Sequence, residues 1–454
     1  MEPVGGLLHR AVVMEVLQAA LAAADPYRAV LSALTTHPIA LAALTQLTPG
    51  GRVYVVGAGK AGTAMTRAAE EVLGERVTAG LVIVKDGHTE PPDASQPSSN
   101  RRVLLKEASH PVPDARGVAA TVELLDLVEQ AGNDDLVLCL ISGGGSALLT
   151  APAEGITLED VQSVTAALLR AGATINELNA VRKHLSRVSG GQLARIAAPA
   201  NVLSLILSDV TGSPLDVIAS GPTVPDTSTF GDALAIILRY NIADSIPLCV
   251  PERLRQGTAG DVSETPKPGD PLFNKVANLL VANNVQAVEA AADKARLVGL
   301  NTGIISTYLE GEARIVGGVL AGIAREVVEF GRPVARPACL LFGGETTVTV
   351  RGNGVGGRNS ELALGAALAL AGLGPNVVVA SLATDGGDGS SPGAGGIVDG
   401  TTIDRGHAMG LNAEAFLANN DSYTYLAQLG DAIMTGPTGT NVNDIMALFV
   451  LESS

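Results

Sequence analysis

Aromatic side chains are scarce in this sequence, and tryptophan is absent. Aromatic residues make up 3 % of the 454 residues. Few rings are therefore present to stack on nucleic-acid bases. Cationic side chains are also in the minority, with 30 Lys and Arg against 46 Asp and Glu and a formal net charge of −16. Because a phosphate backbone would be repelled overall, we expect no nucleic-acid partner, although a local cluster of positive charge could still hold a small anion.

The sequence also lacks the cysteine and histidine patterns of metal sites and disulfide frameworks. Its three cysteines are Cys139, Cys249 and Cys339, an odd number without zinc-ligand spacing. Cys139 and Cys339 lie in apolar runs, and we expect them to pack in the core. The histidines form no H-x-x-x-H pair.

No apolar stretch is long enough to cross a bilayer. The most apolar one, Leu362 to Leu373, is too short and too rich in Ala and Gly. The segment Met1 to Gly5 lacks a basic stretch followed by an apolar one, which argues against a signal peptide. The sequence therefore predicts a soluble cytoplasmic protein without a membrane partner.

The chain has enough apolar material for two or three domains, since 46 % of its residues are hydrophobic. In the first half, short apolar runs alternate with segments of helical spacing, which predicts a mostly parallel sheet with helices on both faces. We expect a Rossmann-like α/β domain over 1–250, a linker over 251–271 and a mixed α/β domain over 272–454. Within the last, 338–342 and 346–350 are expected to be two separate strands.

The glycine loop Ser142-Gly143-Gly144-Gly145-Ser146 is the most informative motif. It follows Leu136 to Ile141, an apolar run typical of a buried parallel strand, and precedes a segment that reads as a helix start. Three glycines leave the backbone amides open to a ligand, and a helix N-terminus adds unpaired N–H groups. The loop suits a phosphate or a carboxylate, while a tight turn without a ligand is the alternative.

A second glycine motif, Gly57-Ala58-Gly59-Lys60-Ala61-Gly62, fits G-x-G-x-x-G after a strand and before a helix. This context is typical of a nicotinamide dinucleotide site, with Asp86 as a candidate ribose ligand. Lys60, however, adds positive charge beside the amides and favours a highly charged phosphate or carboxylate group. The motif leaves both interpretations open, and an exposed lysine on a helical turn is a third.

Polar loops follow several other apolar strands. In open α/β sheets, ligands bind beyond the carboxyl ends of the strands, so these loops are expected to share a cleft. Their carboxylates could hold Mg²⁺ with phosphate or accept a proton from a substrate hydroxyl; they are Asp209, Glu345, Asp385 and Asp388. Arg358 opens a helix behind glycines, and its planar fork suits a carboxylate or a transferring phosphoryl group. Each Asp–Gly pair taken alone also fits an ordinary turn.

Two further polar segments are candidates for the same cleft. Lys183 lies in a helical segment, where the charged run Arg182 to Arg187 fits a solvated face equally well. The polar loop 435–444 precedes the last strand and contains Thr438 and Asn443.

Taken together, these motifs resemble the glycerate 2-kinases that combine an N-terminal α/β domain with a C-terminal MOFRL domain. The matching segments, in chain order, are 56–62, 141–148, 179–186, 208–212, 219–223, 343–347, 356–362, 384–389 and 435–444. Their collinearity over nearly the whole chain is more specific than any single glycine motif. The resemblance implies ATP-dependent phosphorylation of D-glycerate to 2-phosphoglycerate with Mg²⁺, and an active site in the cleft between the two domains.

The resemblance implies the catalytic residues, and the glycine and polar loops described above supply the candidates for binding. Those expected to be catalytic are Lys60, Arg358, Asp209 and Asp385. Those expected to bind substrate or phosphate are Gly57, Gly59, Ser142, Gly143, Gly144, Gly145, Ser146, Lys183, Glu345, Asn359, Thr438 and Asn443. Those expected to bind the metal ion are Asp209, Asp385 and Asp388.

Two other functions stay open. Some members of this family are labelled hydroxypyruvate reductases, so an NAD(P)H-dependent reductase is the first alternative. A non-catalytic metabolite-binding protein is the second, although it would have no use for so many carboxylates. The sequence does not fix which loop holds ATP or what the oligomeric state is, and a homodimer is one option.

Overall fold

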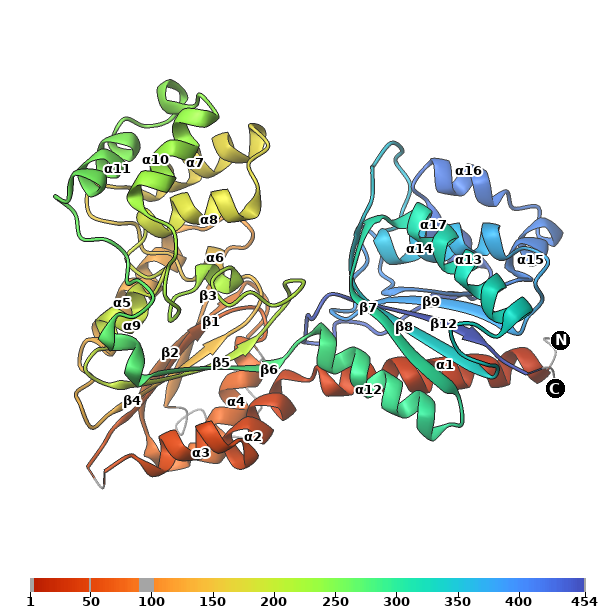
Figure 1. Cartoon of the computed structure of the whole chain (residues 1–454), viewed down its shortest axis with the longest axis horizontal. Helices are drawn as coiled ribbons and strands as arrows, with labels where there is room; N and C mark the ends of the chain where they lie inside the picture. The colour runs from red at the N-terminus through yellow and green to blue at the C-terminus, as the bar shows by residue number, and fades with distance from the viewer. Residues whose placement is uncertain (1–3, 49, 90–101, 453–454) are drawn as a thin grey trace. The chain divides into compact units, whose positions relative to one another are not determined.

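The computed structural model describes residues 4–48, 50–89 and 102–452 and contains two compact units (Figure 1). One unit is Pro26–Val281, which we call the parallel-sheet unit. The other joins Met1–Asp25 to Ala282–Ser454, and we call it the mixed-sheet unit. The first helix therefore belongs with the C-terminal half of the chain, a long-range packing that local sequence patterns do not reveal.

The parallel-sheet unit contains a six-stranded sheet in the order β3-β2-β1-β4-β5-β6. Neighbouring strands from β3 to β5 pair in parallel. Its strands are β1 (Val53–Ala58), β2 (Val77–Lys85), β3 (Val103–Ala108), β4 (Leu136–Ile141), β5 (Asn201–Leu207) and β6 (Val276–Ala282). Every residue of β1 and β4 is buried, as expected for central strands that are covered on both faces. The predicted parallel sheet is thereby confirmed.

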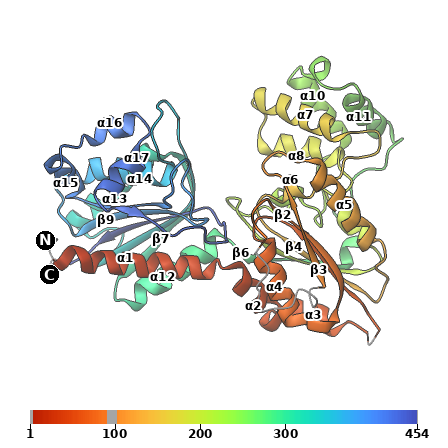
Figure 2. The same cartoon turned by 180° about the vertical axis from the view of Figure 1, so that it is seen from behind.

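Helices cover both faces of this sheet (Figure 2). Side chains of α5 and α9 join alternate residues of the strands in one core, and α2, α3 and α4 cover the opposite face. The helices of the unit are α2 (Pro26–Thr36), α3 (Pro38–Thr45), α4 (Gly62–Leu73), α5 (Ala115–Val128), α6 (Gly145–Leu148), α7 (Leu158–Arg170), α8 (Ile175–His184), α9 (Gln192–Ala197), α10 (Phe230–Arg239) and α11 (Cys249–Ala259).

A second core lies among α7, α8, α10 and α11. The expected linker differs from the structure here, because α11 occupies 249–259 and buries Val250 and Leu254 in this core. Pro251 is tolerated because it lies in the first turn of α11, where its missing N–H would have no helical partner. The chain passes from one compact unit to the other after Asp25 and after Val281 instead.

The mixed-sheet unit contains a six-stranded sheet in the order β11-β10-β9-β12-β8-β7. β7 and β8 pair in parallel, and the other neighbours pair antiparallel, which confirms the predicted mixed sheet. The strands are β7 (Asn301–Glu312), β8 (Ala338–Thr347), β9 (Val377–Ala383), β10 (Gly395–Asp399), β11 (Ala432–Ile433) and β12 (Asp444–Val450).

The expected strand pair at 338–342 and 346–350 is wrong, because β8 runs unbroken from Ala338 to Thr347. Gly343 and Gly344, which resemble a turn in the sequence, are needed for close approach. A Cβ added at Gly344 would lie 2.2 Å from the carbonyl oxygen of Leu309 on β7.

Helices also cover both faces of the mixed sheet (Figure 1). One face packs against α13 and α14 in a single apolar core, and α1 and α12 lie on the other. The helices are α1 (Val4–Ala23), α12 (Asn284–Leu297), α13 (Ala313–Phe330), α14 (Arg358–Leu370), α15 (Thr402–Ala408), α16 (Ala413–Ala418) and α17 (Ser422–Gln428). None of the helices in the described parts of the chain combines the length and the apolar character that crossing a membrane requires.

Candidate functional site

The strand order of the parallel-sheet unit reverses between β1 and β4. One glycine motif begins in the last two residues of β1, and the other directly follows β4. Such a switch point is where ligands bind in open α/β sheets. The two loops are joined, since the Lys60 N–H donates to the Gly143 carbonyl at 2.9 Å and the Ala61 N–H donates to Ser142 Oγ at 3.1 Å. The structure thus brings the two predicted loops together.

The glycine loop leaves two backbone donors unused. The N–H groups of Gly143 and Gly144 donate no hydrogen bond to any residue that the structure describes. Gly144 has a φ of +86°, and α6 begins directly after it. Because α6 is a single turn of four residues, the predicted contribution of a helix N-terminus is small, and the loop amides themselves are the donors.

Lys60, His110 and Gly144 lie close together. A Cβ added at Gly144 would lie 3.0 Å from His110 Cδ2 and 3.4 Å from Lys60 Cγ. Burial, with help from the neighbouring cations of Lys60 and Lys85, lowers the pKa of His110 to about 4. The imidazole is therefore neutral at pH 7. Sequence reasoning missed His110, because no spacing motif marks it.

Asp209 lies on the other side of the same loop. It follows β5, and a Cβ added at Gly143 would lie 2.0 Å from Asp209 Oδ2. Glycine at this position therefore lets a carboxylate approach the loop closely. Of the expected catalytic residues, Lys60 and Asp209 thus flank one glycine loop of the parallel-sheet unit.

The mixed-sheet unit has a polar cavity of about 940 Å³, lined by Glu345, Arg358, Asp385 and Asp388 among others. Arg358 donates through Nη1 to Glu345 Oε1 at 2.7 Å, and through Nε and Nη2 to the two oxygens of Asp444. Although burial favours its neutral form, the carboxylates of Asp444 and Glu345 raise the pKa of Arg358 above its ordinary value. Burial raises the pKa of Asp444 to about 6, against the pull of Arg358.

The side chains of Asp388 and Asn359 both form hydrogen bonds within the mixed-sheet unit. The two carboxylate oxygens of Asp388 accept the backbone N–H groups of Asn359 and Ser360, each at 2.8 Å, at the start of α14. Asn359 Oδ1 accepts a hydrogen bond from Ser381 Oγ at 2.6 Å. Asp385, by contrast, is exposed, and its Oδ1 accepts the Gly387 N–H at 3.0 Å.

Thr438 and Asn443 secure the polar loop before β12. Thr438 Oγ1 donates to the Thr384 carbonyl, and the Asn443 carbonyl accepts both the N–H and the hydroxyl of Thr384. Asn443 adopts a φ of +66°, a conformation that asparagine tolerates better than most residues. Both residues therefore hold this loop against the end of β9.

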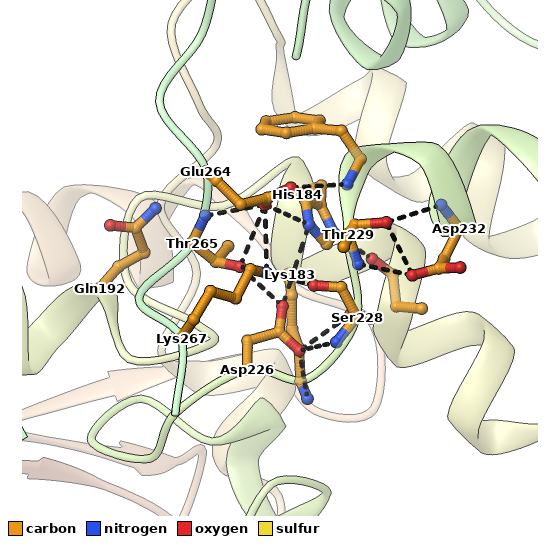
Figure 3. Close-up of polar contacts among 12 residues, drawn as sticks. Lys183, His184, Gln192, Asp226, Ser228, Thr229, Asp232, Glu264, Thr265 and Lys267 are labelled. Carbon is orange, nitrogen blue, oxygen red and sulfur yellow. Dashed lines mark hydrogen bonds and ion pairs between the residues drawn. The ribbon is translucent and has the colours of Figure 1, made fainter. Parts of the chain in front are cut away.

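Lys183 lies in a buried ionic network (Figure 3). Its Nζ lies 3.3 Å from Asp226 Oδ1 and 3.6 Å from Asp216 Oδ2, and its side chain is 5 % exposed. Next to it, His184 Nδ1 is 2.7 Å from the Ala180 carbonyl oxygen and Nε2 is 2.9 Å from Glu264 Oε1. The charge of Lys183, which was expected to bind substrate, is paired with Asp226 instead.

No group of three or more His, Cys, Asp or Glu side chains with metal-binding geometry occurs within residues 4–48, 50–89 and 102–452. The three expected metal ligands also divide between units, with Asp209 in the parallel-sheet unit and Asp385 and Asp388 in the mixed-sheet unit.

Two family models match this chain. One is described as a domain of unknown function (DUF4147) and covers residues 12–255, and the other is the MOFRL family and covers residues 338–444. The chain is 46 % identical to the D-glycerate 2-kinase of Thermotoga maritima over 395 residues, which are 87 % of this chain and 90 % of that protein. It is 42 % identical to the glycerate 2-kinase of Pyrococcus horikoshii over 433 residues, 95 % of each chain.

A relative with a different name is similarly close. A protein of Agrobacterium vitis that is provisionally named a hydroxypyruvate reductase is 43 % identical over 443 residues, 97 % of this chain and 94 % of that protein. Among solved structures, the crystal structure of Thermotoga maritima glycerate kinase matches with a TM-score of 0.86 at 43 % identity. The match covers 97 % of this chain and 99 % of that chain.

Proposed function

This chain belongs to the glycerate 2-kinase family of phosphotransferases, and we propose that it transfers the terminal phosphoryl group of ATP to the 2-hydroxyl of D-glycerate with Mg²⁺. The observation that carries the proposal lies at the ends of β1 and β4. There Lys60 stands beside the N–H groups of Gly143 and Gly144, which no described residue accepts. A cation together with unpaired backbone donors at a strand switch point is a phosphate-binding arrangement.

In the proposed reaction, the oxygen of the 2-hydroxyl attacks the γ-phosphorus, and the bond from that phosphorus to the bridging oxygen of ADP breaks. Asp209, whose carboxylate lies against Gly143, accepts the proton of the hydroxyl. Lys60 and the amides of Gly143 and Gly144 stabilise the charge of the transferring group. Positioning and charge stabilisation supply most of the rate in this type of reaction.

A second set of candidate residues for the reaction lies in the mixed-sheet unit. Arg358 uses three N–H groups on Asp444 and Glu345, so two of the five that a guanidinium carries remain for phosphate oxygens. The carboxylates of Glu345 and Asp385 suit Mg²⁺, which prefers oxygen ligands alongside phosphate and neutralises phosphate charge when bound. Asp388 holds the start of α14 and is not needed as a ligand.

A hydroxypyruvate reductase is the second candidate, favoured by the G-x-G-x-x-G motif at the start of α4 and by the sheet order. One observation counts against it. Asp86, the candidate ribose ligand, pairs through both oxygens with Arg116 at 2.7 and 2.8 Å, and the hydrogen bonds from Arg116 lower its pKa. A ribose hydroxyl would have to compete with that bidentate pair.

A paired assay tests the proposal. ADP release is measured with D-glycerate, ATP and Mg²⁺, each omitted in turn, beside NAD(P)H oxidation with hydroxypyruvate. We expect ADP only in the complete mixture, and 2-phosphoglycerate rather than 3-phosphoglycerate by phosphorus NMR. Oxidation of NAD(P)H without ATP turnover would instead establish the reductase, and binding of glycerate without either reaction would establish a binding protein.

A further inference from the structure

Arg182 on α8 is a partly buried cation without an anionic partner. Its Nε donates to Thr165 Oγ1 at 3.3 Å, and it forms no ion pair with any residue that the structure describes. Burial lowers the pKa of Arg182, and no neighbouring carboxylate opposes that shift. Of the two interpretations that the sequence left open for the run 182–187, the solvated face does not describe this side chain. A charge that is partly removed from water without a compensating partner is costly, and an anionic ligand beside Arg182 would compensate it.

The cavity beside Arg182 is small and rich in hydroxyl groups. Its volume is about 30 Å³, and its lining includes Ser146, Ser186, Ser189 and Ser220. No acidic side chain lies among the described residues of this lining. A single water molecule needs at least about 10–15 Å³ of such space, so the cavity accepts a group of about two water molecules. A carboxylate has this size, whereas a nucleotide triphosphate is far larger.

Unused hydrogen-bond donors accompany the cation. Ser186 Oγ accepts the N–H groups of Val188 and Ser189, each at 3.1 Å, so its own hydrogen is left to donate. The Ser189 hydroxyl has no hydrogen-bond partner within the described residues, although Ser189 is only 8 % exposed. Asn179, one turn before Arg182 on α8, is 3 % exposed, and its Nδ2 likewise finds no acceptor in the described part of the chain. These donors complement an anion.

The cavity adjoins the glycine loop of the candidate site. Ser146 ends that loop, and its Oγ lies 2.9 Å from Ser220 Oγ, which in turn donates to Asn179 Oδ1 at 3.4 Å. The same loop contacts Lys60 through Gly144. Lys60 therefore lies against Gly143 and Gly144 in the middle of this loop, and Arg182 lines the cavity together with Ser146 at the end of the loop.

We propose that this cavity, which we call the Arg182 pocket, binds the carboxylate group of the acid substrate and thereby selects small hydroxy acids over uncharged polyols. Arg182, Ser186 and Ser189 donate to the carboxylate oxygens, and Lys60 is left for the phosphoryl group. The identity of the acid as D-glycerate rests on the proposed function, whereas the carboxylate subsite rests on the pocket itself.

The test compares Arg182→Met with Arg187→Met, since Arg187 is an exposed arginine in the same segment. Binding of D-glycerate is measured by calorimetry without nucleotide, and KM is measured for D-glycerate and for ATP. Arg182→Met is expected to weaken glycerate binding and raise its KM at least about thirtyfold, as loss of one partner of a buried charge pair does. The KM for ATP should change less than about twofold, and Arg187→Met should behave as wild type.

A neutral substrate analogue shows whether Arg182 acts on the carboxylate itself. D-Glyceramide replaces the carboxylate by an amide, so wild type should lose most of its binding, while Arg182→Met should bind acid and amide about equally. If Arg182→Met bound glycerate as wild type does, or lost binding to acid and amide by the same factor, the subsite would be wrong. Should Arg182→Met fail to fold, Arg182→Gln, which keeps hydrogen-bond donors but removes the charge, takes its place with the same two criteria.

The two proposals fail separately. Glycerate binding that depends on Arg182 in a protein without kinase activity would overturn the kinase and uphold the pocket. Kinase activity in which Arg182→Met leaves the KM for glycerate unchanged would uphold the kinase and overturn the pocket.

Discussion

Arg358 and Asp444 form a two-point pair across 86 residues of sequence, with Nε 2.6 Å from Oδ2 and Nη2 3.0 Å from Oδ1. The Asp444 side chain is fully buried, whereas that of Arg358 is 31 % exposed. The carboxylate thus fixes one edge of the guanidinium and leaves the other edge at the cavity. A charge that is held in place in advance stabilises a developing charge without further reorganisation.

The first prediction concerns pH. Asp444 has a pKa of about 6 in the folded protein, above the ordinary 3.8, so the native state binds the proton more tightly than the unfolded state does. The free energy of unfolding should therefore fall as pH rises from about 4 to 6, by up to about 3 kcal/mol from this group. Urea unfolding of wild type and of Asp444→Asn at steps of half a pH unit isolates the effect. Only wild type should show this part of the fall in the free energy of unfolding. If the free energies of unfolding of wild type and Asp444→Asn changed with pH in parallel, the prediction would be wrong.

The second prediction concerns Arg358→Met. Loss of a phosphate-binding cation should lower kcat/KM at least about a hundredfold. The variant should also lose about 3–5 kcal/mol of stability above pH 7, because Asp444 is left charged, buried and unpaired. Arg405→Met is the matched control, since Arg405 pairs in the same way with buried Asp431 at 2.6 Å. It should also lose stability in the unfolding assay, although less because Arg10 remains 3.6 Å from Asp431, and it should keep the kcat/KM of its folded fraction. Equal losses of activity in both variants would reduce Arg358 to a structural role.

Local patterns in the sequence predicted the strands and the loops that follow them. β4 occupies the predicted 136–141, and the joined loops of Lys60 and Ser142 follow from the rule that ligands lie at strand ends. The partners of these residues were not predictable in the same way. Asp444 lies 86 residues from Arg358, and Asp226 lies 43 residues from Lys183, so no local period connects either pair.

Sequence patterns predicted the wrong structure at positions where the role of a glycine depends on tertiary packing. Gly343 and Gly344 read as a turn, but they lie inside β8. A side chain at Gly343 would meet Asn284 of α12, and one at Gly344 would meet the backbone of Leu309 on β7. The helix α1 likewise carries no local signal that it packs in one compact unit with the segment that begins at Ala282. Arg182 looked like part of a charged run because sequence shows the charge of a side chain but not its burial.

The third prediction concerns Lys60. Lys60→Met should lower kcat at least about a hundredfold, because the amides of Gly143 and Gly144 alone would face the phosphoryl charge. The thermal midpoint should be unchanged within error, since Lys60 makes no ion pair within the described residues that its loss would break. Lys106→Met, which removes a lysine from a solvent-facing pair with Glu123, serves as the control and should keep full activity. Near-normal turnover in Lys60→Met would identify Lys60 as a surface residue.

The fourth prediction separates backbone strain from site chemistry. Gly144 and Gly155 have similar positive φ values, +86° and +76°, but only Gly144 has neighbours within 4 Å of an added Cβ. Alanine at either position should cost about 1 kcal/mol of stability through strain. Only Gly144→Ala should also reduce glycerate-dependent ADP release, because its methyl group meets His110. Equal activities in the two variants would show that the glycine loop is a turn without a ligand.

The last prediction concerns Lys183, which the structure pairs with Asp226. Both side chains are at least 95 % buried, so Lys183→Met leaves a carboxylate without its cation. Removal of one partner of a buried pair typically costs about 3–5 kcal/mol, and replacing both partners is far less harmful. Lys183→Met should therefore show a large loss of the free energy of unfolding measured with urea. The double variant Lys183→Met/Asp226→Asn should recover part of that loss, because Asn can still form hydrogen bonds with Ser228 and Thr265. The KM for both substrates should stay near wild type in whatever fraction is folded. A raised KM in the stable double variant would instead show that Lys183 binds substrate.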